Sequence, residues 1–220
     1  MDAIECIRSR RSIRAYKKEP VPKEILTRII ETALWSPSYK NTQPWEVIIV
    51  SGKKKEELSS LLISLLERGE PPCPDIPEPT SWPETQQERI NRLYRMRAEA
   101  TGVDLTNPET VKKAKVANFN FYGAPHVIYL YQDGSLPLWS LFDLGLFAQS
   151  LMLAASAMGV ATVPQAFATD YARYIKDFLG LPQSKRLVLG LSTGYPDLES
   201  RANIFRPDRV PVNEVLRWAE

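Results

Sequence analysis

The sequence predicts an α+β protein in which a small sheet lies inside a shell of helices. Three apolar runs are typical of buried strands: "WEVIIVSG" (45–52), "APHVIYLYQD" (124–133) and "KRLVLGLSTGYPD" (185–197), the last of which ends in a turn. These runs lie far apart in the chain, and helical patterns occupy the intervals between them. No internal repeat and no change of composition marks a second domain, so the 220 residues predict one.

Helices are expected first in the N-terminal third. Residues 2–9 form a short helical pattern that ends at a cluster of arginines. The pattern over 21–36 has apolar residues at helical spacing, Pro22 near its first turn and Pro37 after its end. Residues 53–67 place five leucines on one side of a third amphipathic helix.

Two consecutive segments in the middle of the chain differ in composition from the rest: one is rich in proline and the next is rich in charged residues. Residues 71–83 contain six prolines and predict an exposed, semi-rigid loop, because proline suits neither a helix interior nor a central strand. Residues 84–100 predict a charged helix, and its arginines favour a solvated face, with a lid over a site as the alternative; they are Arg89, Arg92, Arg95 and Arg97.

One segment, 138–164, is long and apolar enough to span a bilayer. Its serines, its Gln149 and the absence of basic flanks favour instead a helix buried on every side and shared with a partner subunit. Beyond it, 161–168 predicts a short extended segment that meets a turn. Residues 171–179 predict a helix capped by Gly180, and the tail from 201 ends in a short amphipathic segment.

Composition excludes several kinds of protein. The net charge of +2 argues against nucleic acid as a partner. Two cysteines without a CxxC pair and a single histidine argue against a disulfide framework, a metal site and a Ser-His-Asp triad. The N-terminus lacks the apolar segment of a secretory signal. We therefore expect a cytoplasmic protein without a metal and outside the membrane.

Two stretches near the N-terminus could bind a ligand. Arg10, Arg11, Ser12 and Arg14 offer forked donors and a hydroxyl to a phosphate or a carboxylate, although a basic turn at a helix end would look the same. The stretch "SPSYKNTQPW" (36–45) offers amides that could recognise the edge of a planar heterocycle, or it is only a helix-to-strand connection.

Two later stretches add to these candidates. In "VPQAF" (163–167) an extended backbone could present N–H groups to a ligand. In "NIFRPDRVP" (203–211) Arg206 and Arg209 could join the N-terminal cluster around one phosphate, or could be surface charge. Neither a GxGxxG nor a GxxxxGK[ST] fingerprint occurs, so neither the Rossmann nor the P-loop mode of nucleotide binding is supported.

Taken in order, these segments resemble the nitroreductase family of FMN-dependent oxidoreductases. The resemblance rests on "RRSIRAY", "SPSYKNTQPW", "GVATVPQAF", "LGLSTGYPD" and "RPDRVP". It implies a nitroreductase-like α+β fold over 1–220, with a small, mostly antiparallel sheet surrounded by helices, in an intertwined homodimer with FMN at the subunit interface. Residues 69–113 match no motif of the family and are expected to be a variable loop and helix that bear on substrate choice.

The resemblance also implies roles for individual residues. Arg10, Arg11, Ser12 and Arg209 would reach the FMN phosphate, with Arg206 as a further candidate, and Arg14 would lie at the N1/O2 side of the flavin. A positive charge there stabilises the anionic reduced flavin. The flavin would also contact the other subunit's Pro37, Ser38, Tyr39 and Asn41, and the extended segment Pro164, Gln165 and Ala166, with the backbone of Gln165 and Ala166 near N5. The contact to the N3/O4 edge has no assigned residue.

The implied activity is a ping-pong hydride transfer from NADH or NADPH through flavin N5 to nitroaromatics, quinones or other flat electrophiles. No side chain need act as acid or base, so no catalytic residue is named. Candidate aromatic lining residues, each also a candidate for the core, are Tyr39, Phe119, Phe121, Tyr122 and Phe167. The alternatives are a specialised family member, acting in enone reduction, dehalogenation or flavin fragmentation, and a flavin-binding sensor without turnover.

Overall fold

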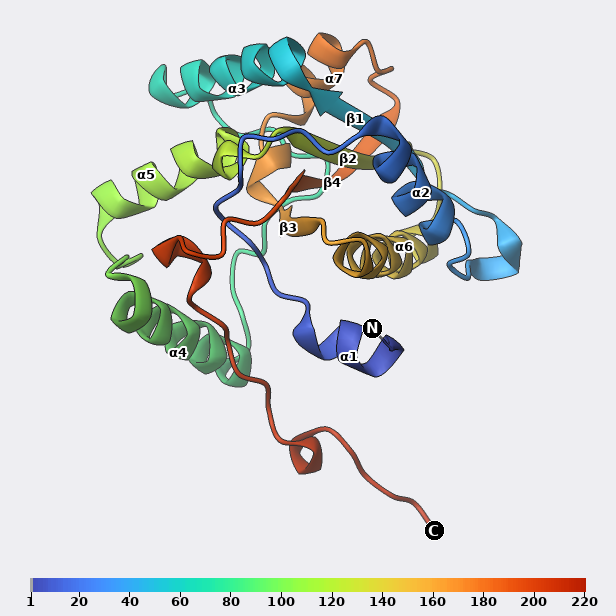
Figure 1. Ribbon diagram of the computed structural model, residues 1–220, viewed down its shortest axis with the longest axis vertical. Coiled ribbons are helices and arrows are strands. Elements are labelled where there is room, and N and C mark those ends of the chain that lie inside the picture. The colour runs from blue at the N-terminus through green and yellow to red at the C-terminus, as the bar shows by residue number, and fades with distance from the viewer. Residues whose placement is uncertain (1) are drawn as a thin grey trace.

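The computed structural model describes residues 2–220, whose centre is one four-stranded sheet (Figure 1). The strands are β1 (Glu46–Ser51), β2 (His126–Asp133), β3 (Ala161–Gln165) and β4 (Lys185–Gly194). Their spatial order is β1-β2-β4-β3, and every neighbouring pair is antiparallel. The predicted α+β class with a small antiparallel sheet is therefore confirmed.

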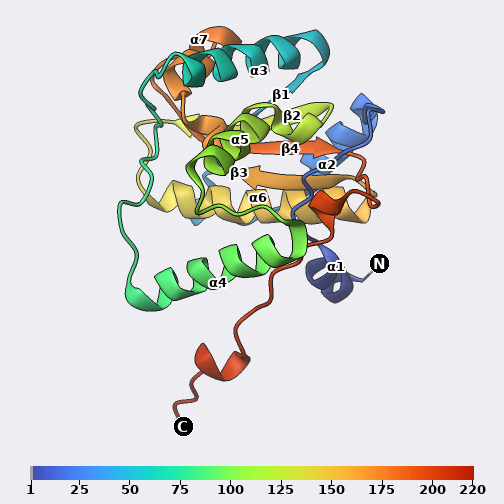
Figure 2. The ribbon, with the colours of Figure 1, turned by 90° about the vertical axis from the view of Figure 1, so that its left-hand side faces the viewer.

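Helices cover both faces of the sheet, and β2 shows how its sequence divides them. On one face lie α3 (Gly52–Glu67), α5 (Pro108–Phe119) and α7 (Ala172–Leu179); on the other lie α2 (Lys23–Ala33) and α6 (Trp139–Ala157) (Figures 1 and 2). Successive side chains of a strand point to opposite faces. Thus Val127 and Tyr129 pack with the first set, whereas Ile128 and Leu130 pack with α2 and α6.

Two helices lie outside this three-layer core. Helix α1 (Ala3–Ser9) and helix α4 (Glu84–Thr101) lie beyond α6, and the C-terminal tail runs away from the body of the molecule past them (Figures 1 and 2). No residue of α4 is fully buried. A charged helix without a buried stripe must be positioned by contacts other than core packing.

Most expected elements form close to their predicted bounds, and Gly180 caps α7 with φ +69° as expected. The sequence patterns missed α5 altogether. The extended segment after α6 is a fourth strand, β3, on an edge of the sheet. Pro164 has no N–H to donate, and an edge strand tolerates this because it has a neighbouring strand on one side only. Strand β1 is the other edge, so most of its residues are only partly buried, not fully buried as predicted.

The long apolar helix is not buried on every side within the single chain, so its predicted burial together with a partner subunit stays a prediction. On α6 and at the residue before it, one face is open, and Leu138, Trp139 and Phe142 are 78%, 62% and 60% exposed. By length and composition alone this helix could cross a membrane, but half of its most apolar window is buried against the rest of the protein. A core helix of a soluble protein meets the same description.

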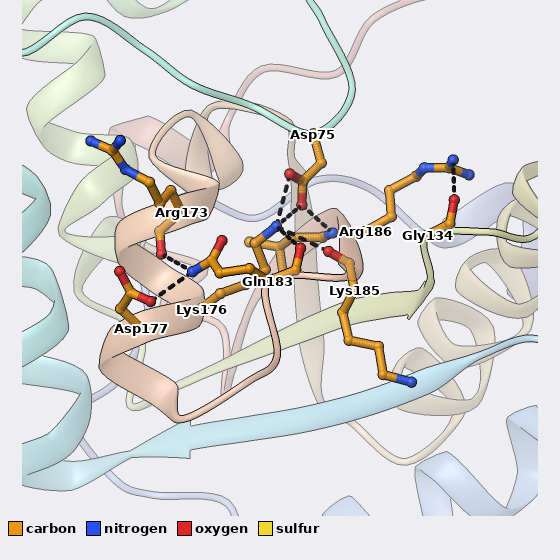
Figure 3. Close-up of polar contacts among 9 residues, drawn as sticks. Asp75, Gly134, Arg173, Lys176, Asp177, Gln183, Lys185 and Arg186 are labelled. Carbon is orange, nitrogen blue, oxygen red and sulfur yellow. Dashed lines mark hydrogen bonds and ion pairs between the residues drawn. The ribbon is translucent and has the colours of Figure 1, made fainter.

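The proline-rich segment is anchored, not simply exposed (Figure 3). The ammonium of Lys176, on α7, donates to Asp75 Oδ1 at 2.9 Å and Oδ2 at 2.8 Å. Asp75 Oδ2 also accepts the backbone N–H of Leu187 at 2.7 Å. The ammonium has two further acceptors, the carbonyls of Gln183 and Lys185. This ion pair, between the buried Lys176 and the partly buried Asp75, holds the loop against the start of β4.

Candidate functional site

The arginine cluster near the N-terminus follows directly on the end of α1. The N–H of Arg10 donates to the carbonyl of Cys6 at 3.1 Å and closes the helix. The chain then runs extended, and the N–H of Ile13 donates to the carbonyl of Thr162 in β3 at 3.2 Å. Because the Ile13 side chain is buried, its neighbours Ser12 and Arg14 are directed away from that core contact.

A buried asparagine from the C-terminal part of the chain fixes this extended segment. Asn203 is 1% exposed, and its Oδ1 accepts the N–H of Arg14 at 2.6 Å. Its Nδ2 donates to the carbonyls of Ala15 at 2.9 Å and Asp197 at 2.7 Å. Asn203 therefore joins the segment before residue 16 to the segment that contains Arg206 and Arg209. Sequence analysis gave this residue no role.

The C-terminal segment brings its own arginines to the same place. Arg206 donates through Nη2 to the carbonyl of Arg8. Arg209 donates through Nη1 to the carbonyls of Pro207 at 3.2 Å and Asp208 at 2.8 Å. Neither contact neutralises a guanidinium, because each acceptor is a backbone carbonyl.

Helix α4 lies against this tail and is tied to it by charge. Arg89 forms an ion pair with Glu214 at 3.1 Å, and Arg92 forms one with Asp208. Both pairs are exposed, so each contributes about 1 kcal/mol or less. The prediction of a solvated arginine face on this helix thus holds for Arg89 and Arg92 but not for Arg97, which is partly buried and points into a cavity.

These three segments enclose a cavity of about 140 Å³. It is lined by the N-terminal Arg10, Arg11, Ser12 and Arg14, by Leu93, Tyr94 and Arg97 of α4, and by Phe205, Arg206, Pro207 and Arg209. Six of these residues are arginines and none is acidic. The structure therefore brings together every arginine that sequence analysis singled out as a candidate, from opposite ends of the chain.

The electrostatics of the cavity are those of an anion site. Burial and then repulsion from Arg209 lower the pKa of Arg10. Burial and then repulsion from Arg14 lower the pKa of Arg97. The Nε of Arg14 is buried, and within residues 2–220 it has no hydrogen-bond partner. Crowded cations without acids are destabilising unless an anion joins them, so these residues fit a phosphate group such as that of FMN.

The loop of Pro37, Ser38, Tyr39 and Asn41 lies elsewhere in the chain. It follows α2 at the side of the molecule opposite to α4, so a single chain does not bring it to the arginine cavity (Figure 1). The N–H of Tyr39 donates to both carboxylate oxygens of Asp143 at 3.1 and 3.2 Å, and its ring stacks on Trp139. The loop is thus held on the open face of α6.

The end of β3 places Pro164, Gln165 and Ala166 at the edge of the sheet. The buried Gln165 side chain is fully used: Nε2 donates to the carbonyl and Oδ1 of Asn118, and Oε1 accepts from the N–H and hydroxyl of Ser192. Pro164 and Ala166 are exposed, and none of the three lines the arginine cavity. Only their backbone and outer surface are accessible to a ligand.

The aromatic candidates divide between core and surface. Phe119 and Phe121 belong to the core beneath α3 and α7. Tyr122 lies beside the site, with the guanidinium carbon of Arg14 6.0 Å from its ring centre. Phe167 lies 5.2 Å from the ammonium of Lys115, and Tyr39 is 55% exposed.

Of the cavity residues on α4, the sequence patterns missed Leu93 and Tyr94 and did not separate Arg97 from the other arginines of the helix, for which a lid over a site was the alternative. Their helix falls in the segment without a family motif, and all four of its arginines look alike in sequence. Arg97 differs from the other three only because the position of α4 over the N-terminal segment places it at the cavity. Across residues 2–220, no three His, Cys, Asp or Glu side chains gather as a metal site would require, and both cysteines are free.

Comparison with known proteins agrees with the fold. Residues 7–195 match the model of the nitroreductase family. The chain is 34% identical over 217 residues to a 4-nitrobenzoate reductase of Pseudomonas putida, covering 94% of this chain and 90% of that protein. It is 33% identical to nitroreductase NfnB of Mycolicibacterium smegmatis, covering 99% and 92% of the two chains.

A solved structure extends this likeness to three dimensions. The crystal structure of the FMN-dependent nitroreductase NfnB from Mycobacterium smegmatis, in complex with NADPH, superposes with a TM-score of 0.94. The identity is 31%, over 99% of this chain and 98% of that one. The likeness includes the segment 69–113, which matched no motif of the family in sequence.

Proposed function

Because the chain belongs to the nitroreductase family, we propose that it is an FMN-dependent oxidoreductase that transfers a hydride from NADPH or NADH to nitroaromatic, quinone or other flat electrophilic acceptors. The observation that supports this most is the cavity with six arginines and no acidic residue, built from both ends of the chain. The similar P. putida protein is named for a nitroaromatic substrate, and the similar NfnB is an FMN-dependent enzyme that binds NADPH.

Within this proposal the cavity holds the cofactor's phosphate. Arg10, Arg11, Ser12 and Arg209 donate to its oxygens, with Arg206 beside them. Guanidinium groups suit this task because they present parallel N–H donors and remain charged even when partly buried. Arg14 faces the N1/O2 side of the flavin, where its unpartnered Nε supplies a donor and its charge favours the reduced anion.

The flavin ring is held between two copies of the chain. Pro37, Ser38, Tyr39 and Asn41 reach it from the second subunit, which agrees with their distance from the cavity of their own chain. The open face of α6, with Leu138, Trp139 and Phe142, supports a homodimer, because exposed apolar side chains of this size are typically covered by a partner.

The remaining residues orient the cofactor without acting as acid or base. Bound FMN supplies the redox chemistry by accepting a hydride at N5 and delivering it to the acceptor. Gln165, clamped by Asn118 and Ser192, holds the end of β3 rigid so that the backbone at Pro164 and Ala166 stays near N5. The two half-reactions alternate in one pocket, with the donor leaving before the acceptor enters.

We propose that the whole chain serves this one function. Residues 1–220 form one domain of the nitroreductase type, in which the loop and helix of 69–113 are its variable part. The enzyme works in the cytoplasm, where NADH and NADPH are produced, on small molecules and not on nucleic acid or membranes.

The test is the visible spectrum of the purified protein before and after anaerobic addition of NADH, then of NADPH. We expect a yellow protein whose flavin bands are bleached within seconds by at least one donor and restored by a nitroaromatic or a quinone. A yellow protein that neither donor bleaches would point to a flavin-binding role without turnover. A colourless protein that takes up no added FMN would contradict the proposal.

A further inference from the structure

The arginines of the cavity fall into two groups. Arg10 has Arg209 as its charged neighbour, and repulsion between them contributes to the lowered pKa of Arg10. Arg97 has a different set of neighbours, Arg14, Tyr122 and Tyr94. Arg14 in turn lies beside the ring of Tyr122. Arg10 and Arg209 thus form one group, which the proposed function assigns to the cofactor phosphate, and Arg14 and Arg97 form a second, which it places toward the ring.

The cavity has more positive charge than one cofactor can neutralise. A phosphate monoester has about two negative charges near neutral pH, and the four arginines that the proposed function assigns to it already exceed them: Arg10, Arg11, Arg206 and Arg209. Arg14 is matched by the proposed reduced flavin. Arg97 is left with no acidic partner among residues 2–220, although it is partly buried.

A comparison with the other arginines of α4 shows that a partly buried arginine without an acidic partner occurs at only one position of the helix. Arg89 and Arg92 are exposed and have carboxylate partners in the tail. Arg95 is exposed and lines a separate groove on the outer side of the helix. Arg97 alone among the four is partly buried, and it lines the cavity. A buried guanidinium costs stability unless a ligand supplies its counter-charge.

We propose that Arg97 binds an anionic group, a carboxylate or a phosphate, of the second molecule that reacts at the flavin ring. This rests on the proposed function, because it takes the ring of FMN to lie on the Arg14 side of the cavity. The planar fork of the guanidinium matches both kinds of anion. The anion comes either from a carboxylated acceptor or from the additional phosphate of NADPH, and Arg97 is then a specificity-determining residue of the variable segment.

The test uses oxidised, FMN-loaded protein, so that no turnover is needed. Changes in the flavin spectrum report the binding of benzoate against neutral benzamide, and of NADP⁺ against NAD⁺. The variant is Arg97→Gln, with Arg97→Lys to keep the charge but lose the fork. Arg95→Gln is the matched control, because it removes the same charge from the same helix outside the cavity.

We expect Arg97→Gln to weaken the binding of one anionic probe about tenfold or more and its neutral or less charged counterpart less than twofold. Arg97→Lys should restore part of the loss, and Arg95→Gln should change nothing. Loss confined to benzoate identifies an acceptor carboxylate, and loss confined to NADP⁺ identifies the donor phosphate.

Two results would overturn the proposal. In one, both probe pairs bind to Arg97→Gln as they do to the parent protein. In the other, Arg97→Gln loses FMN itself, which would assign this residue to the cofactor phosphate. A parent protein that takes up no FMN would instead reject the proposed function, so the two failures can be told apart.

Discussion

The buried cation Lys176 and the arginines that line the cavity are positive groups of the same molecule, but their surroundings are opposite. The ammonium of Lys176 donates to both oxygens of Asp75 and to the carbonyls of Gln183 and Lys185 (Figure 3). The cavity presents six guanidiniums to one another and no carboxylate. Asn203 holds the N-terminal segment of the cavity through its backbone, and ion pairs outside the cavity tie α4 to the tail.

This difference distinguishes a charge that stabilises the fold from charges that bind a ligand. A buried ion pair whose hydrogen bonds are all made within the chain stabilises one arrangement of that chain. A group of like charges without internal partners gains stability only when a counter-charge binds. Removing a partner from the first region should therefore lower stability, and removing a cation from the second should lower affinity.

The largest effect should follow the loss of the carboxylate in the first region. Asp75→Ala leaves the Lys176 ammonium buried without its counter-charge, so the free energy of unfolding should fall by about 3–5 kcal/mol. Urea unfolding at one fixed protein concentration measures this. Lys53→Met, which removes one member of an exposed pair, is the control and should change stability by less than about 0.5 kcal/mol. An equal loss in both variants would remove the distinction between the regions.

A second, smaller effect concerns Asp170, a buried carboxylate that belongs neither to the Lys176 ion pair nor to the arginine cavity. The carboxylate of Asp170 is buried, and burial, then repulsion from Glu78, raises its pKa to about 6. Because the folded state holds its proton more tightly than the unfolded state, ionisation destabilises the fold as pH rises from about 4 to above 6.

Asp170→Asn should therefore stabilise the protein at pH 8, by at most about 3 kcal/mol, and hardly at all at pH 4. Thermal or urea unfolding of parent and variant across this pH range measures the difference. Glu31→Gln, an exposed carboxylate on α2, is the control and should show no such trend. A gain that is the same at both pH values would show that ionisation of Asp170 is not its source.

The smallest expected change in free energy follows a substitution in the cavity, and it should be a change in the affinity for FMN. Arg10→Gln should weaken FMN binding about tenfold, equivalent to about 1.4 kcal/mol. Without FMN the same variant should be no less stable than the parent, because it relieves repulsion with Arg209. Fluorescence titration of the apoprotein gives the first quantity and urea unfolding the second.

Arg28→Gln on the exposed side of α2 is the matched control and should leave both quantities unchanged. A variant of Arg10 that is destabilised without FMN yet binds it normally would reverse the assignment. The arginine would then be structural, as Lys176 is.

The sequence predicted three of the four strands, most helices and the arginines of the cavity-forming segments near the two ends of the chain, because apolar periodicity and charge clustering are local properties. Helix α5 was missed because three lysines interrupt its apolar pattern, although its start was visible: Asn107 caps Glu109 and Thr110, and Pro108 occupies the first turn. The N-cap was a better signal than the periodicity. The open face of α6 could not be predicted, since composition gives no direction to a helix that is apolar all round.

The site was predicted where it depends on residue type and missed where it depends on packing. Arginines near both ends could be joined in one hypothesis because a phosphate needs several donors. Asn203 and Arg97 could not be found, because each differs from its neighbours only in what folds against it. Pro37 and Gln165 were placed in one site with the arginines by resemblance alone, and within the single chain neither lines the arginine cavity.

The joining of the two chain ends by Asn203 has a consequence for biosynthesis. A ribosome makes Arg10 about 200 residues before Arg209, and earlier parts of a chain begin to fold while synthesis continues. The anion cavity does not exist until the segment with Asn203, Arg206 and Arg209 has emerged to meet the segment of Arg10 to Arg14. A nascent chain without that later segment thus lacks the cavity, however much of the sheet it has already formed.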